Sequence, residues 1–230
     1  MLCPACSVIL YERVAFQEYA EYALDVKVRG GMKAKTVSSY RDLLTRINSE
    51  IGPLKLQDIR PNHLNRCYAK LAEPGQNKRT GEPLSPKTIR NHHMILKDFF
   101  TYAETKYKLF GNPTLSTTRP EVVQKEMRVL RPDEMQIFME EVMKETQRIA
   151  ILTDLFTGLR VGELLALEIA DLDLKRQTLS VNKNMIRVET AALSLDNPTI
   201  RILNYDPAKK THLIVQDTPK TKSSNREIAI

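Results

Sequence analysis

The stretch TGLRVGELLALE, Thr157 to Glu168, decides how the chain is interpreted. A glycine precedes Arg160, and an apolar run at helical spacing follows it, with Glu163 three residues after the arginine. A plain core helix would carry another leucine in place of Arg160. The two charged residues therefore either pair on a helix surface or belong to a site that needs a fixed positive charge.

The charge of the chain is unevenly distributed. The 230 residues, 42% of them hydrophobic, are enough for one large domain or two small ones, and the formal net charge is +7. Residues 1–118 hold 18 Lys and Arg against 11 Asp and Glu, whereas residues 119–230 hold 17 of each. A cationic first half favours a polyanionic partner such as DNA, although a solvated basic surface would give the same count.

The cysteines and the apolar runs argue against a zinc site and a membrane span, and they indicate a reducing setting. Three cysteines (Cys3, Cys6 and Cys67) and no signal peptide predict a reducing, cytoplasmic setting. Cys3 and Cys6 have the spacing of half a zinc site, but no second Cys or His pair follows at a matching distance. We therefore expect residues 1–11 to be an N-terminal extension, and we expect no metal and no cofactor. No window approaches 18 uncharged apolar residues, so no membrane span is predicted.

Helical spacing of apolar residues predicts an all-helical first domain over residues 12–112. Its four helices are expected at about 12–29, 36–51 and 61–72, and from 86 to the GNP stretch at 111–113, the last with Ser85 as its N-cap. Residues 113–126 show no sustained period and are interpreted as a linker between domains.

A mixed α/β domain is predicted over residues 127–230. Helices are expected after a cap at Asp133, over 147–156, and over RVGELLALEIADL at 160–172. The β-branched, alternating stretches TLSVNKNMIRV, THLIVQ and REIAI predict strands, and residues 189–211 are interpreted as a long connection.

The motif TGLRVGELLALEIADLDL closely resembles the phage-type integrases of the tyrosine recombinase family. LKLQDIRPNHLNRCYAKL and NKRTGEPLSPKTIRNHHMILKDFFTYA resemble the helical core-binding domain of integrases from Gram-positive mobile elements, and TPKTKSSNREIAI resembles their lysine-bearing β-hairpin. The resemblance covers about residues 12 to 230. It implies a mostly α fold with a small β-sheet: an all-helical, SAM-like core-binding domain followed by a partial mixed α/β catalytic domain.

The family's chemistry gives the charged pair a role. The resemblance implies site-specific recombination of double-stranded DNA, in which a tyrosine attacks a phosphodiester without a metal, a nucleotide or a small-molecule substrate. It makes Arg160 the first catalytic arginine and Glu163 the acidic residue of the site. Lys220 or Lys222 would protonate the leaving 5′-oxygen, and Lys220 fits the family pattern better. A guanidinium suits this role because it can contact two phosphate oxygens at any workable pH.

The sequence also departs from the family pattern. The family's HxxR motif and its nucleophilic tyrosine do not occur after Lys222. HLNR, His63 to Arg66, precedes the linker and has the wrong context, and Tyr205 lies in the connection between predicted strands. The chain is thus interpreted as the N-terminal two-thirds of an integrase, and the complete enzyme is expected to oligomerise on DNA. The alternatives are a non-catalytic DNA-binding remnant that regulates a full-length recombinase, and a helical interaction protein.

A basic cluster is expected to contact DNA. It lies in the loop before the fourth helix and in that helix's first turns, with further residues around the second helix: Lys78, Arg79, Lys87, Thr88, Arg90 and Asn91, then Lys33, Lys35 and Arg41. Lys183 and Arg187 could contact DNA from the strand region, or they could simply border an exposed sheet edge.

We predict that the 230-residue chain binds DNA but does not cut it. Strand cleavage needs a nucleophile in line with the leaving oxygen, and no tyrosine follows the predicted lysine hairpin. Incubation with a nicked suicide substrate followed by denaturing electrophoresis should show no covalent protein–DNA band. A band that survives the denaturant would contradict this and direct attention to Tyr205. A band that forms only when a C-terminal recombinase fragment is added would agree with it.

Overall fold

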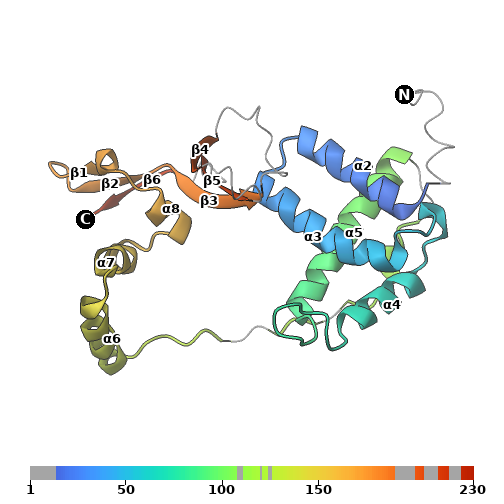
Figure 1. Cartoon of the computed structure of the whole chain (residues 1–230), viewed down its shortest axis with the longest axis horizontal. Helices are drawn as coiled ribbons and strands as arrows, with labels where there is room; N and C mark the ends of the chain where they lie inside the picture. The colour runs from blue at the N-terminus through green and yellow to red at the C-terminus, as the bar shows by residue number, and fades with distance from the viewer. Residues whose placement is uncertain are drawn as a thin grey trace. The chain divides into compact units, whose positions relative to one another are not determined.

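The computed structural model describes residues 14–107, 111–119, 121–123, 126–189, 200–204, 212–217 and 224–230. The chain divides into two compact units, which we call the helical unit (Met1–Gln124) and the mixed unit (Lys125–Ile230). Figure 1 shows helices in the first and both helices and strands in the second. The fold class predicted from the sequence is confirmed: the chain is mostly helical, with small antiparallel sheets.

The helical unit is built from four α-helices that the apolar spacing predicted to within a few residues. They are α2 (Phe16–Arg29), α3 (Ala34–Ile51), α4 (Pro61–Leu71) and α5 (Pro86–Tyr107), with short 3-10 helices η2 (Leu56–Asp58) and η3 (Pro113–Ser116). Ser85 caps α5 as predicted, because its Oγ accepts the backbone N–H of Thr88 at 3.2 Å.

Aromatic side chains from α2 and α5 form the centre of the helical unit's core. The rings of Phe16 and Phe100 stack with centroids 5.8 Å apart, and Tyr19 meets Phe99 edge to face at 6.5 Å. The buried Tyr19 hydroxyl donates to the Phe99 carbonyl at 2.6 Å, so its polar end is satisfied. This packing holds the long helix α5 against α2, and it leaves one side of α5 in solvent.

The mixed unit has three α-helices and two three-stranded antiparallel sheets in its described residues. The helices are α6 (Pro132–Lys144), α7 (Arg148–Thr157) and α8 (Val161–Leu165), followed by the 3-10 helix η4 (Ile169–Asp171). One sheet has the order β1-β2-β6, from Leu172–Asp173, Thr178–Val181 and Arg226–Ala229. The other has the order β3-β5-β4, from Asn184–Glu189, His212–Asp217 and Arg201–Asn204.

Four predictions for the mixed unit were wrong. The helix expected over 160–172 ends at Leu165, because Asp171 accepts the backbone N–H of Glu168 and starts a separate 3-10 turn. The N-cap of α6 is Arg131, whose N–H is bound by Glu134 rather than by Asp133. The stretch TLSVNKNMIRV forms two strands in different sheets, and β4 lies within the segment that was predicted to be a connection.

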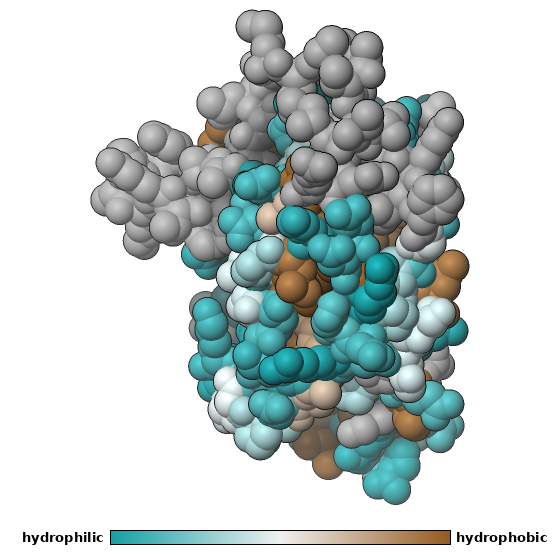
Figure 2. All heavy atoms as spheres, turned by 90° about the vertical axis from the view of Figure 1, so that its right-hand side faces the viewer, coloured by the Kyte–Doolittle hydropathy of each residue, from teal (hydrophilic) through white to brown (hydrophobic). Residues whose placement is uncertain are grey.

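The two units differ in how much apolar surface they bury. Leu159, Leu179 and Val181 form a small buried cluster in the mixed unit, with Leu164 and Ile228 packed against it. No residue of α7 is buried, and its Ile149 and Phe156 are exposed. In Figure 2, hydrophilic residues cover most of the described surface on the face shown, and apolar residues occur there as small separate patches. Among the described residues, no helix is long and apolar enough to cross a membrane.

Two glycines shape the turn that carries Arg160. Gly158 ends α7 in the left-handed conformation (φ 61°), which a glycine adopts without steric cost. Gly162 lies against β3: a Cβ at this position would be 2.2 Å from the Asn184 side-chain oxygen and 2.8 Å from the Met185 carbonyl oxygen. The absence of a side chain at Gly162 therefore lets α8 approach β3 closely.

Gly162→Ala should destabilise the mixed unit by about 1–3 kcal/mol, because the added methyl group must displace a backbone carbonyl. Urea unfolding followed by the NMR amide signals of β2 would measure this. Leu165→Ala on the same helix is the matched control; its side chain is 58% exposed, and we expect a change within about 0.5 kcal/mol. Equal stability of the Gly162→Ala variant and the parent chain would contradict the close packing of α8 on β3.

Candidate active site

Glu163 is a buried carboxylate at the centre of a small ionic cluster. It lies on α8, and its side chain is 3% exposed. Its Oε2 accepts the backbone N–H of Arg160 at 3.0 Å, and its Oε1 accepts the Arg160 Nη1 at 2.8 Å. The Arg160–Glu163 pair therefore exists, but it is not an ordinary surface pair, because its acidic member is buried.

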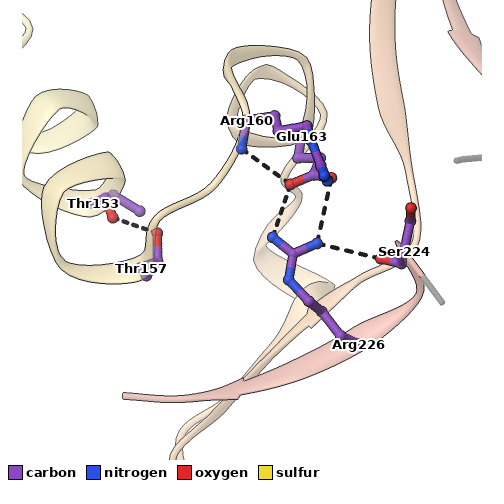
Figure 3. Close-up of polar contacts among 6 residues, drawn as sticks. All are labelled: Thr153, Thr157, Arg160, Glu163, Ser224 and Arg226. Atoms are coloured by element: carbon purple, nitrogen blue, oxygen red, sulfur yellow. Dashed lines mark hydrogen bonds and ion pairs between the residues drawn. The ribbon is translucent and has the colours of Figure 1, made fainter. Parts of the chain in front are cut away.

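A second arginine binds the same carboxylate from the other side. Arg226, at the start of β6, donates from Nη2 to Glu163 Oε2 at 2.9 Å and from Nη1 to Oε1 at 3.3 Å. The Arg226 Nη1 also donates to the Ser224 carbonyl at 3.3 Å. Figure 3 shows Glu163 between the two arginines, with Arg226 reaching up to it from the strand. Both carboxylate oxygens thus accept two hydrogen bonds each.

This arrangement keeps Glu163 ionised. The hydrogen bonds from Arg226, together with those from the Arg160 backbone and side chain, outweigh the effect of burial and lower the pKa of Glu163 from 4.5 to about 2. The same contact raises the pKa of Arg226. The cluster therefore carries one negative and two positive charges at any pH near neutrality.

The Arg160 side chain is presented to solvent. It is 74% exposed although its Nη1 and backbone N–H are bound to Glu163. An exposed guanidinium that is anchored on a buried carboxylate keeps its remaining donors available for an anion. This geometry suits recognition of a phosphate oxygen.

The other two predicted site residues, Lys220 and Lys222, lie outside the described residues, as does Tyr205. Cys3 and Cys6 also lie outside them. Among the residues that the structure describes, no group of three or more His, Cys, Asp or Glu side chains is placed to hold a metal ion.

Arg226 was not among the site residues predicted from the sequence. Its stretch, REIAI, was interpreted only as a strand and as part of the lysine-bearing hairpin. One signal was present, since Arg226 is a cation at the start of a short apolar strand. However, its partner lies 63 residues earlier in the chain, and no local pattern connects the two.

The predicted DNA-contacting residues are arranged around α3, α5 and the loop before α5. Lys78 and Arg79 lie in a loop closed by backbone hydrogen bonds, from Gly75 N–H to Gly81 O at 2.7 Å and from Asn77 N–H to Glu82 O at 2.9 Å. The Arg46 guanidinium donates to the Gln76 carbonyl at 2.7 Å and ties this loop to α3. The loop therefore holds its two cations on a braced turn.

The remaining candidates follow on two helices. Lys87, Arg90 and Asn91 are exposed on the first turns of α5. Thr88 is engaged locally, because its hydroxyl is hydrogen-bonded to the Ser85 cap at 2.9 Å. On α3, Lys33 is the N-cap, and Lys35 and Arg41 follow along the helix.

Lys183 has two acidic partners in the mixed unit, and these contacts favour neither of the two alternatives left open for it. Its Nζ donates to Asp171 at 2.7 Å and to Glu168 at 2.9 Å, so it ties the start of β3 to η4. These acidic partners raise the pKa of Lys183 despite the opposing effect of burial. Arg187 is exposed on β3.

Lowering the pH should weaken the mixed unit through Glu163. The pKa of Glu163 is lower in the folded chain than its ordinary 4.5. The stability that ionised Glu163 contributes is therefore complete above pH 4.5 and is lost as the pH falls toward 2. The depression corresponds to about 3 kcal/mol. The stability difference between the parent chain and Glu163→Gln, from urea unfolding followed by the amide signals of β2, should shrink between pH 6 and pH 3. A difference that stays constant over this range would contradict the assignment.

Comparisons with known proteins identify a relative in sequence and solved structures with a similar fold. No protein-family profile matches the chain. Over 189 residues it is 28% identical to a tyrosine recombinase XerC-like protein of Caldanaerobacter subterraneus subsp. tengcongensis. This match covers 80% of the chain and 43% of that protein, so the chain spans less than half the length of its curated relative.

Solved integrases share the fold. The Tn1549 transposon integrase, in complex with a circular intermediate DNA, matches with a TM-score of 0.68 and 21% identity over 94% of this chain and 61% of that one. The lambda integrase dimer bound to a core site matches with a TM-score of 0.61 and 18% identity over 79% of this chain and 49% of that one. The predicted resemblance to tyrosine recombinases and integrases is confirmed.

Proposed function

From the resemblance to tyrosine recombinases and the fold shared with integrases, we propose that this chain binds double-stranded DNA and supplies part of the active site of a site-specific recombinase. The observation that carries the proposal is the exposed Arg160 guanidinium, anchored on the buried Glu163 carboxylate. It offers a fixed positive charge where a scissile phosphodiester would gain negative charge in the transition state.

Each part of the chain has a role in this proposal. Residues 12–112 would be the core-binding domain that holds DNA, residues 113–126 the linker, and residues 127–230 a partial catalytic domain. Lys220, with Lys222 as the alternative, would protonate the leaving 5′-oxygen. Phosphoryl transfer of this kind uses no cofactor, and it would take place in the cytoplasm.

DNA would be the partner, and the complete recombinase would assemble as several copies on it. The Tn1549 and lambda proteins are described in complexes with DNA, the latter as a dimer. The helical unit here carries the charge excess that such binding needs. Its braced loop holds Lys78 and Arg79, and Lys87 and Arg90 follow on the first turns of α5. None of these four has an acidic partner among the described residues.

Replacing Lys78, Arg79, Lys87 and Arg90 together by glutamine should weaken duplex DNA binding by the full chain and flatten its salt dependence. Removing one phosphate contact makes the slope of log affinity against log salt shallower by about 0.9. Fluorescence anisotropy with a labelled duplex at several salt concentrations would measure the slope.

A matched control removes the same number of exposed cations elsewhere on the helical unit, at Arg29, Lys55, Arg66 and Lys106. We expect this variant to keep most of the slope. Equal slopes for both variants would place the DNA interface elsewhere, and no salt-dependent binding by the parent chain would contradict the proposed function.

A further inference from the structure

Arg226 and Arg160 bind the same carboxylate but face different surroundings. The Arg226 side chain is 31% exposed, and its two terminal nitrogens donate three hydrogen bonds, two to Glu163 and one to the Ser224 carbonyl. Arg160 is 74% exposed and makes one side-chain bond to Glu163. Arg226 therefore makes its contacts within the protein, whereas Arg160 is presented to solvent.

We propose that Arg226 is a positioning residue, which acts through Glu163 to hold the Arg160 guanidinium in place as a positive charge available to a phosphate. This inference rests on the proposed function, because it assigns Arg226 a role in the same site.

The geometry of the contact between Arg226 and Glu163 supports this role. A guanidinium has a rigid, planar fork of donors, and Arg226 uses two of them on the two oxygens of Glu163. This fixes the plane of the carboxylate. The remaining acceptor positions then point at the backbone N–H and the Nη1 of Arg160. Without Arg226, Glu163 would be held by a residue only three positions away on the same short turn.

The net charge of the cluster also depends on Arg226. With Arg226 present, one carboxylate lies between two guanidiniums, and the cluster has a net charge of +1. Without Arg226, the charges of Glu163 and Arg160 cancel. A neutral pair attracts a phosphate much less strongly, so Arg226 lets Arg160 bind Glu163 and still act as a cation.

Arg226 is itself held in place by strand pairing. It begins β6, which pairs with β2 in the register Val181 to Arg226 and Leu179 to Ile228. Val181 and Leu179 belong to the buried cluster of the mixed unit. The strand pairing therefore places Arg226 opposite α8 independently of any ligand.

A purely structural ion pair is the rival explanation, and a double-mutant cycle separates the two. The affinity of the full chain for a short DNA duplex is measured for the parent, Arg160→Ala, Arg226→Gln and the double variant. The Arg160→Ala change should weaken binding about tenfold in the parent, as loss of a charge-assisted hydrogen bond does. In the Arg226→Gln background the same change should have almost no effect. Because each comparison keeps residue 226 constant, the charge of Arg226 cancels. An equal effect of Arg160→Ala in both backgrounds would overturn the inference.

A second measurement does not depend on DNA. In the ¹⁵N-arginine-labelled chain, relaxation of the Arg160 Nε–H group reports how well the side chain is ordered. Arg226→Gln should raise its mobility to that of a free arginine, whereas Arg29→Gln, a change in the helical unit, should leave it unchanged. Unchanged mobility in Arg226→Gln would overturn the inference.

The two measurements also separate this inference from the proposed function. If the parent chain binds no DNA, or if Arg160→Ala does not affect binding, the proposed function fails and the relaxation result alone judges Arg226. If Arg226→Gln does not fold, Arg226→Lys takes its place. Lysine keeps the positive charge but not the fork, so it should leave Arg160 more mobile than in the parent, and parent-like order would overturn the geometric argument.

Discussion

The site depends on one buried carboxylate. A charged group with 3% exposure is costly to bury unless its hydrogen-bonding capacity is filled, and three side-chain donors and one backbone N–H, all from two arginines, fill that of Glu163. Because Arg226 lies on β6, the carboxylate on α8 connects two elements that are far apart in sequence. The close approach of α8 to β3 at Gly162 and the left-handed turn at Gly158 bring this carboxylate into position.

The parts of the fold that could be predicted from the sequence are those governed by local periodicity. Helix α5 was expected to run from residue 86 to the GNP stretch at 111–113 and is found at Pro86–Tyr107, since its apolar stripe and its Ser85 cap are both local signals. The helix after Arg160 was predicted to be longer than it is, because the apolar spacing continues past Leu165. In the structure the helix ends there, and Asp171 starts a separate turn. Arg226 could not be predicted as a site residue, because a contact across 63 residues is set by strand pairing.

In the proposed function, the helical unit would meet the needs of DNA binding in a different way from the candidate active site. Lys78 and Arg79 are exposed, and the backbone around them is braced by hydrogen bonds within the loop and by Arg46 from α3. Such a loop loses little conformational freedom when it binds a phosphate backbone. The mixed unit uses paired charges to hold one arginine, and the helical unit uses a rigid loop to present exposed cations.

The difference in buried apolar surface between the two units has a thermodynamic consequence. Among the described residues, the helical unit has a large aromatic and aliphatic core, whereas the mixed unit has a small apolar cluster, a few other buried apolar residues and no buried residue on α7. A ligand that binds only the folded form adds its binding free energy to folding. The smaller the free energy of unfolding of a unit, the larger the share of it that such an addition forms. In the proposed function, DNA bound at Arg160 would therefore stabilise the fold of the mixed unit as well as position the phosphate.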